Sequence, residues 1–432
     1  MSLIETLIRW FGSPNNKERE FGKTFRSLSN RNFRVYSIGQ VISLCGTWMQ
    51  ITALPWLVYT MTDSATALGI VSFAGSVPLL LLTYFGGTLA DRFDRRRVLL
   101  TMQTLAMLQA IVLFTLVVTG AISYPLIVAL ALLGGCITAL DLPTRQAFVP
   151  DLVDKEHLTN AIALNSAVWN TCRMIGPALA GVLIGVFGEA ICFGINAVSF
   201  IAALVTLTMI RVNREEKARA ERDPNSEPSK QTEEPGLMSV LLSPPVVTVL
   251  LLSIATGMFG FQYSVLLPVI VDRLLGGNAS TLGFLSAAAG VGALVGSLAL
   301  ASKPDNHNLR RIIGLAPLAL AVAITIVALS PWTTLSLLAL ALGGISISVQ
   351  LSGGLSLVQM AVPSEKRGRI MGVYSTCMLG FTPFAAMLAG YLASTIGITY
   401  TLLLSAAIVA VAATIYLSVA SRMIHLDGDK QG

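Results

Sequence analysis

Charged side chains inside long apolar stretches are the residues of this chain best suited to chemistry. Arg173 lies about fourteen residues, or roughly 21 Å of helix, into the apolar stretch 159–186. Such a charge costs at least ~2.5 kcal/mol in lipid unless it faces a partner or water. We expect Arg173 either to attract an anionic group of a ligand or to serve as a buried hydrogen-bonding post, for example to Asn170.

Asp141 is the carboxylate that lies deepest in an apolar stretch, near the end of 123–146, whereas Asp63, Glu189 and Asp272 lie at boundaries. A proton-driven carrier needs a group that titrates during its cycle, and carboxylates within membranes usually supply it. Asp141 is therefore the candidate for coupling. Pairing with Arg145, four residues further on, is the alternative role.

The histidines and cysteines form no catalytic or metal-binding pattern. His157, His307 and His425 fall in loops or tails, so no Ser-His-Asp set is indicated. The cysteines all fall within apolar stretches and lack metal-ligand spacing, which indicates small core residues. We therefore expect neither enzymatic activity nor a cofactor or metal. The five cysteines are Cys45, Cys136, Cys172, Cys192 and Cys377.

The composition predicts an all-α polytopic membrane protein. Only 12% of the residues are charged and 54% are hydrophobic, with a mean hydropathy of +0.73. Ordinary soluble domains carry about 25% charged residues, and a span needs roughly 20 apolar residues. Twelve spans are predicted, at 36–59, 65–89, 97–119, 123–146, 159–186, 190–210, 246–272, 280–302, 311–330, 332–358, 368–393 and 397–420.

Basic residues predict the orientation. All Lys and Arg except Arg173 and Arg273 fall in the tails or in alternate loops on one face. The positive-inside rule makes that face cytoplasmic, with both termini inside a bacterial inner (plasma) membrane. The net charge of +6 is thus a topology signal, and no nucleic-acid partner is expected. We expect a monomer surrounded by the lipid bilayer.

The chain repeats itself at about half its length. The stretch 68–72 recurs at 282–286, and 133–135 recurs at 342–344. Two similar six-helix halves predict a transporter whose path runs between them. The predicted parts are a tail at 1–34, an N-terminal half at 35–210, a charged linker at 211–244, a C-terminal half at 245–421 and a tail at 422–432.

The loop after the second span, Gly87-Thr88-Leu89-Ala90-Asp91-Arg92-Phe93-Asp94-Arg95-Arg96, resembles the loop signature of the major facilitator superfamily. The stretches 141–153, 165–181 and 367–372 resemble the branch of that superfamily that includes bacterial enterobactin (siderophore) exporters and macrolide efflux pumps. That branch tolerates Asp94 where the signature usually has Gly. The resemblance covers roughly residues 25–420.

This resemblance implies roles for particular residues. It makes Gly87, Asp91, Arg92, Arg95 and Arg96 parts of a latch that joins the two halves on the cytoplasmic side, and we expect Arg145 to be the partner of Asp91. The alternative is a positive-inside anchor without a moving part. In the fifth span, Gly176, Pro177 and Gly181 resemble a motif associated with antiporters, which favours export.

The fold implied by the resemblance lines a central cavity chiefly with spans one, four, seven and ten. The cavity candidates are Trp48, Gln50, Asn170, Arg173, Gln262, Tyr263, Ser346, Ser348 and Gln350. We expect a secondary exporter of an amphiphilic small molecule, siderophore or drug-like, working by proton antiport. The alternatives are an uptake carrier, a lipid or lysolipid flippase, a membrane enzyme and a transport-dead sensor.

Asp91→Asn tests the predicted latch. The substitution removes the carboxylate charge that pairs with arginine, so we expect transport to fall while the protein still inserts into the membrane. Transport and surface expression are measured on the same cells. Wild-type transport by a well-expressed variant contradicts the latch.

Overall fold

The computed structural model describes residues 25–210, 244–301, 309–361 and 380–428, together with Tyr374 and Cys377. These residues form helices joined by short turns, with no strand in the described ranges. Eleven helices are long and apolar enough to cross a membrane. The all-helical membrane fold expected from the composition is confirmed.

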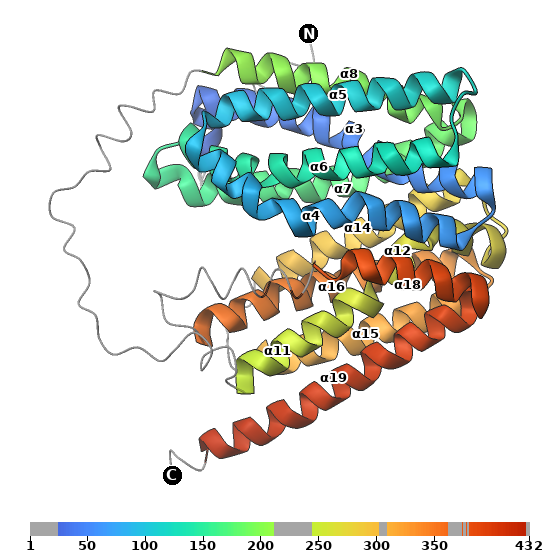
Figure 1. The fold of residues 1–432 in the computed structure, drawn as a ribbon. Coiled ribbons are helices and arrows are strands. Elements are labelled where there is room, and N and C mark those ends of the chain that lie inside the picture. The colour runs from blue at the N-terminus through green and yellow to red at the C-terminus, as the bar shows by residue number, and fades with distance from the viewer. Residues whose placement is uncertain are drawn as a thin grey trace, which may run out of the picture.

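The N-terminal half contains six long helices, in the order that the apolar stretches predict (Figure 1). Short helices η1 (Arg26–Ser29), η2 (Val149–Leu152) and η3 (Lys155–His157) flank them. The long helices are α3 (Arg31–Thr62), α4 (Ala65–Arg92), α5 (Arg95–Val118), α6 (Tyr124–Phe148), α7 (Leu158–Phe187) and α8 (Ala190–Met209).

The C-terminal half repeats this arrangement with one broken span. Its first span consists of α11 (Pro244–Ala255), η4 (Thr256–Gly260), α12 (Gln262–Val265), α13 (Leu267–Val269) and η5 (Ile270–Leu274). Five helices follow: α14 (Ala279–Ala301), α15 (Leu309–Leu329), α16 (Thr333–Ala361), α18 (Thr382–Thr395) and α19 (Ile398–Gly428). Apart from α18, little of the eleventh predicted span is described, because most of 362–379 lies outside the described residues.

The seventh span differs from the single helix predicted at 246–272. Two five-residue π-helical turns, η4 and η5, interrupt it. Pro268 lacks the backbone N–H that a continuous helix needs, and Gly260 packs where a Cβ would lie 2.8 Å from Leu320. π-Helical turns within α-helices are found frequently at functional sites. The break therefore makes this span unlike its repeat partner, the continuous α3.

Capping residues set two helix ends that hydropathy misplaces. Asn30 accepts a hydrogen bond from the backbone of Asn32, so α3 begins at Arg31 rather than at 36. Asp94 likewise caps α5 by accepting from the Arg97 backbone N–H at 2.8 Å. A capping carboxylate thus stands where the loop signature usually has Gly.

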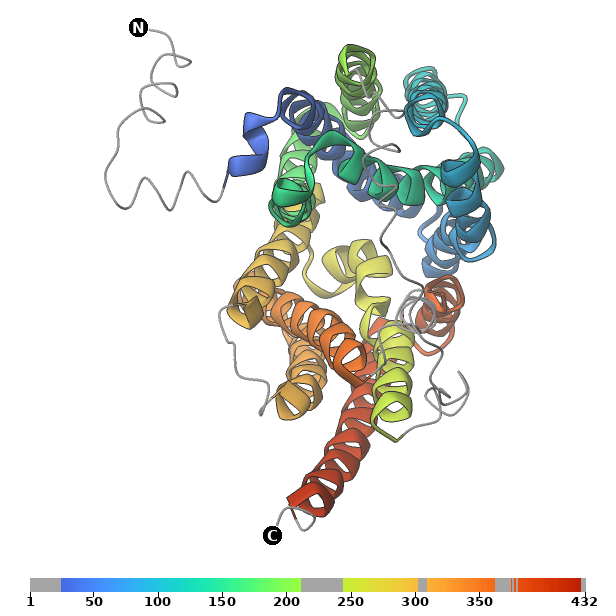
Figure 2. The same ribbon diagram turned by 90° about the vertical axis from the view of Figure 1, so that its left-hand side faces the viewer.

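The two halves are joined at one end of the molecule, which we name the turn end because it carries the turns 62–65, 187–190 and 274–279 (Figure 1). The opposite end, where α8 stops and α11 starts, is named the linker end. One buried apolar cluster includes residues of both halves, such as Leu57 and Leu267. At the linker end, each half has a cluster of its own, built around Tyr36 and Tyr416 respectively. The halves diverge there (Figures 1 and 2).

Two glycine-lined crossings bring the halves together toward the turn end. In the first, between α7 and α14, a Cβ on Gly181 would lie 2.7 Å from the Ala279 carbonyl and 2.8 Å from the Gly283 Cα. In the second, between α4 and α18, a Cβ on Gly69 would lie 2.7 Å from the Ala386 carbonyl. Small residues permit this backbone contact, which drives helix association in lipid.

Gly181→Ala tests the first crossing. The added Cβ meets backbone atoms, which cannot rotate away, so we expect the joined arrangement to lose about 1–3 kcal/mol. Gly185→Ala, one turn along, is the matched control because its Cβ meets only the Ser280 hydroxyl, at 2.9 Å. Labelling of Ser286→Cys by an impermeant maleimide from the turn end, in a cysteine-free background, should accelerate for the first variant alone. Equal labelling in both contradicts the expectation.

Candidate functional site

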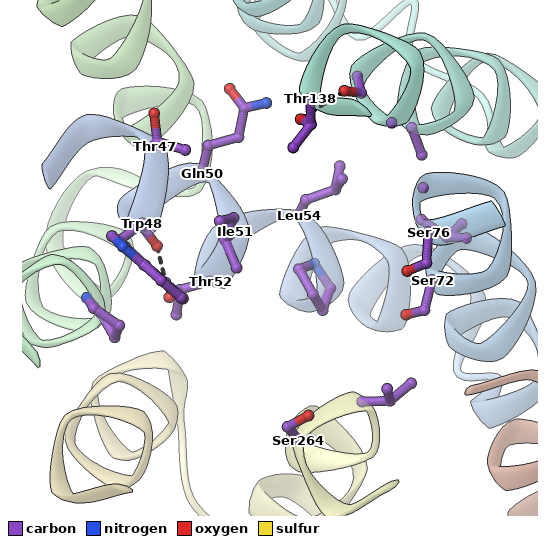
Figure 3. Close-up of a pocket in the computed structure, with 18 of the residues that line it drawn as sticks. Thr47, Trp48, Gln50, Ile51, Thr52, Leu54, Ser72, Ser76, Thr138 and Ser264 are labelled. Carbon is purple, nitrogen blue, oxygen red and sulfur yellow. Dashed lines mark hydrogen bonds between the residues drawn. The ribbon is translucent and has the colours of Figure 1, made fainter. Parts of the chain in front are cut away.

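A cavity of about 630 Å³ lies between the two halves. Figure 3 shows Trp48 and Thr52 of α3, Ser72 and Ser76 of α4, and Ser264 of the opposite half around the same space. The other polar lining residues are Thr47, Gln50, Gln109, Thr138, Arg173, Asn196, Tyr263, Ser286 and Thr382. Cavities of this size hold drug-sized ligands.

Several predicted cavity residues lie on this lining, whereas others do not. Trp48, Gln50, Arg173 and Tyr263 line it, as does Pro177 of the span-five motif. Gln262 and Gln350 are each 1% exposed and bond within their own half, to Ser405 and Thr256.

The tenth span contributes no described residue to the lining, because α16 packs against α14 and α15. Ser346 is buried in this span and Ser348 is absent from the lining. Asn170 is absent from the lining as well and bonds to the Ser166 carbonyl at 3.0 Å. The hydrogen-bonding post that we considered between Arg173 and Asn170 is therefore not formed.

A chain of amides crosses the cavity wall of the N-terminal half. Asn196 donates to Gln50 at 2.8 Å, Gln50 donates to Gln109 at 3.2 Å, and Gln109 donates to the Leu130 carbonyl at 3.3 Å. The chain links α8, α3, α5 and α6. We did not predict Gln109 or Asn196, although polar residues within spans tend to face the bundle interior.

Arg173 lies against an aromatic pair at the cavity. Its guanidinium carbon is 5.8 Å from the centre of the Trp48 ring, within the range of a cation–π contact. Trp169 packs edge-on against Trp48, with ring centres 6.4 Å apart. Among the described residues, Arg173 forms no ion pair and no hydrogen bond.

A polar network joins the halves at the turn end. Tyr59 of α3 donates to Asp272 at 2.7 Å, and Arg273 donates to the Tyr59 hydroxyl at 3.2 Å. Arg273 also pairs with the Asp63 carboxylate at 3.0 Å and donates to its carbonyl at 3.2 Å. Asp63 has a φ of +46°, a left-handed conformation unusual for a non-glycine residue. That conformation lets both Asp63 acceptors face Arg273.

The Arg273 hydrogen bond lowers the pKa of the Asp63 carboxyl below its ordinary value, with a smaller contribution from Tyr59. A lowered pKa keeps the carboxylate ionised at neutral pH. The pair is therefore fully formed above the ordinary carboxyl range and is lost only as the pH falls through the lowered pKa.

A buried ion pair lies within the N-terminal half toward the linker end. Arg145 donates to Asp141 at 2.6 and 3.0 Å, and Gln103 donates to the other Asp141 oxygen at 2.9 Å. Arg145 also donates to Gln40 of α3. Asp141 is 9% exposed and does not line the cavity. The side chain of Asp91, the partner that we predicted for Arg145, lies outside the described residues.

Arg95 and Arg96, two of the other predicted latch residues, anchor the loop between α4 and α5. Arg95 pairs with Asp151 at 2.9 Å, and Arg96 donates to the last carbonyls of α8 at 2.6 and 2.7 Å. Arg92 is exposed. A Cβ on Gly87 would meet nothing within 4 Å, whereas Gly86 packs tightly on α6. Gly86, rather than Gly87, therefore contributes to the α4–α6 contact, together with Gly135 of α6, which packs on Gly75.

Known proteins resemble this chain along most of its length. The staphyloferrin A transporter of Staphylococcus aureus is 33% identical over 59% of this chain, and the match spans 63% of that relative's length. The multidrug efflux pump Tap of Mycolicibacterium fortuitum is 27% identical, covering 83% of this chain and 88% of the pump. The enterobactin exporter EntS of Escherichia coli O1:K1 is also 27% identical, covering 83% and 84%.

Solved transporter structures share the fold. An inward-facing bacterial homologue of the iron transporter ferroportin aligns with a TM-score of 0.68 at 18% identity, covering 90% of this chain and 99% of that one. The nucleoside transporter NupG aligns with a TM-score of 0.69 at 12% identity, covering 90% and 98%. The family model described as transmembrane secretion effector matches residues 22–430, so the chain belongs to this family of major facilitator superfamily transporters.

Proposed function

We propose that the protein exports an amphiphilic small molecule across a bacterial plasma membrane by alternating access, with both termini in the cytoplasm. The observation that carries the proposal is the cavity between two halves that are joined at the turn end and have separate cores at the linker end. The basic loops assign the linker end to the cytoplasm. A substrate then enters from the cytoplasm and leaves when the turn end opens.

The relatives favour a siderophore or a drug as the substrate class, since their names state staphyloferrin A, enterobactin and multidrug efflux. The cavity supports an amphiphile because the amides on one wall face apolar residues such as Leu267 and Leu282 on the other. An uptake carrier and a lysolipid flippase share this geometry. The vesicle assay below distinguishes these three functions by the direction of transport and by the ligand that is transported.

Arg145 provides a route to proton antiport. Protonation of Asp141 in the present arrangement would leave a buried guanidinium without its counter-charge, which is strongly destabilising. If Arg145 moves to Asp91 when the linker end closes, Asp141 is left free to take a proton. The same exchange would pair α6 with α4 within the N-terminal half, so that one arginine would serve both Asp141 and Asp91.

Everted vesicles with an acidic interior test this function. Siderophores, macrolides, dyes and lysolipids are added outside, and proton release is followed with a fluorescent pH probe. We expect one ligand class to dissipate the gradient in the wild type but not in Asp141→Asn. Asp151→Asn is the matched control, because Asp151 is also paired with an arginine but lies beyond the end of α6 and away from the cavity lining.

Ligand uptake without proton release would contradict antiport. Accumulation only in right-side-out vesicles would contradict export.

The Asp63–Arg273 pair should hold the turn end closed. Asp63→Arg places two cations together, so we expect the turn end to open more often, by no more than a few-fold because exposed pairs are weak. Arg273→Asp added to that variant restores an opposite-charge pair and should restore closure. Maleimide labelling of Ser286→Cys from outside measures opening. From pH 5 to 8 the wild-type rate, divided at each pH by the labelling rate of a fully exposed cysteine, should stay constant, because the lowered pKa of Asp63 keeps the carboxylate ionised.

Labelling that is unchanged in the Asp63→Arg variant would show that the pair does not contribute to closure. A double variant that labels as fast as the single one would show that the effect came from lost packing.

A further inference from the structure

We propose that Arg173 and Trp48 form a subsite for the anionic head of an organic substrate that carries one negative charge beside a flat apolar body. The proposal rests on the exporter function and adds a charge class to it.

Arg173 is the uncompensated charge of the described cavity lining. That lining includes no Asp or Glu. The described carboxylates that form ion pairs are engaged elsewhere, Asp141 with Arg145, Asp151 with Arg95 and Asp63 with Arg273. A charge at mid-span is costly without a partner or water. A bound anion would supply the missing partner, since arginine binds carboxylate and phosphate through paired donors.

The contact with Trp48 leaves the donors of Arg173 available. The guanidinium lies over the ring face at 5.8 Å, and a cation–π contact uses the face of the ring rather than the N–H groups. Trp169 packs at 90° to Trp48 and fixes the position of the indole. The close approach of α7 to α3, where a Cβ on Gly176 would lie 2.5 Å from the Trp48 Cβ, holds the two helices in register. The site is thus built before a ligand arrives.

The surrounding walls define the rest of the ligand. Ile51 and Leu54 extend the apolar surface along α3, and Val265 and Leu267 face the cavity from the other half. One guanidinium neutralises one charge, so a second negative charge would meet apolar walls and be disfavoured. The ligand class is therefore a monoanionic amphiphile of drug size. Its head is a carboxylate, sulfonate or phosphodiester, from a soluble acid or from a lysolipid.

A charge series tests the subsite on the purified wild-type protein. 1-Naphthoate, 1-naphthamide and 1-naphthylmethylammonium share a ring system and differ mainly in charge. We expect calorimetry to give roughly tenfold or greater preference for naphthoate over the amide, the scale of a charge-assisted hydrogen bond, with the ammonium weakest. Equal affinities would overturn the subsite, and the vesicle assay would still judge export independently.

Variants of Arg173 test whether this residue is the source of the preference for naphthoate. Arg173→Gln should abolish the preference for naphthoate over naphthamide, and Arg173→Lys should retain part of it because the charge remains without the planar fork. Arg97→Gln, an exposed arginine outside the cavity, is the control. Wild-type preference in Arg173→Gln would overturn the proposal. If that variant does not fold, the wild-type charge series decides.

Competition separates the two sources of the anion. Displacement of naphthoate by lysophosphatidylglycerol but not by lysophosphatidylcholine would support the subsite and indicate a lipid head as the source. Displacement by soluble aryl carboxylates alone would support it with a soluble acid as the source. Displacement by both lysolipids to the same extent would overturn recognition of charge.

Discussion

The cost of an uncompensated charge in lipid determines where the charged residues of this chain lie. Arg145 is buried and is compensated by Asp141 one helical turn away, with Gln103 and Gln40 satisfying the remaining groups. Removing one member of such a pair typically costs 3–5 kcal/mol. Arg173 has no acidic partner among the described residues. Its guanidinium lies over the Trp48 ring, at the lining of the cavity. Arg173 is therefore the position at which a bound anion would supply the missing counter-charge.

The low polarity of the lipid also determines where the two halves contact each other. Lipid provides little hydrophobic force between helices, so backbone contact at Gly181 and Gly69 joins the halves. Among the described residues, the polar contacts between the halves lie toward the turn end. Opening of that end would divide the buried apolar cluster that includes residues of both halves. The clusters at the linker end belong to one half each and would stay intact.

Hydropathy predicted the helices well, because span length is a local property of the sequence. The cavity was predicted less completely. The lining includes three of the predicted residues, Trp48, Gln50 and Arg173. Gln350 instead bonds within the C-terminal half. The rotation of a helix about its axis depends on the helices packed against it, which a single sequence does not reveal. Gln109 and Asn196 were missed for the same reason. Gly87 stays a predicted latch residue, whereas the close contact of this stretch with α6 is made by its neighbour Gly86.

The halves resemble each other in topology but differ in chemistry. Every amide and charged group on the described cavity lining, from Gln50 to Asn196, comes from the N-terminal half. The C-terminal half contributes hydroxyls, apolar residues and the broken span with its two π-helical turns. The continuous α3 carries Trp48 and Gln50 on the cavity lining, whereas the interrupted span contacts Tyr59 and Asp63 through Asp272 and Arg273. Although the halves share a topology, the amides and the charged group of the described lining therefore lie in one half and the π-helical turns lie in the other.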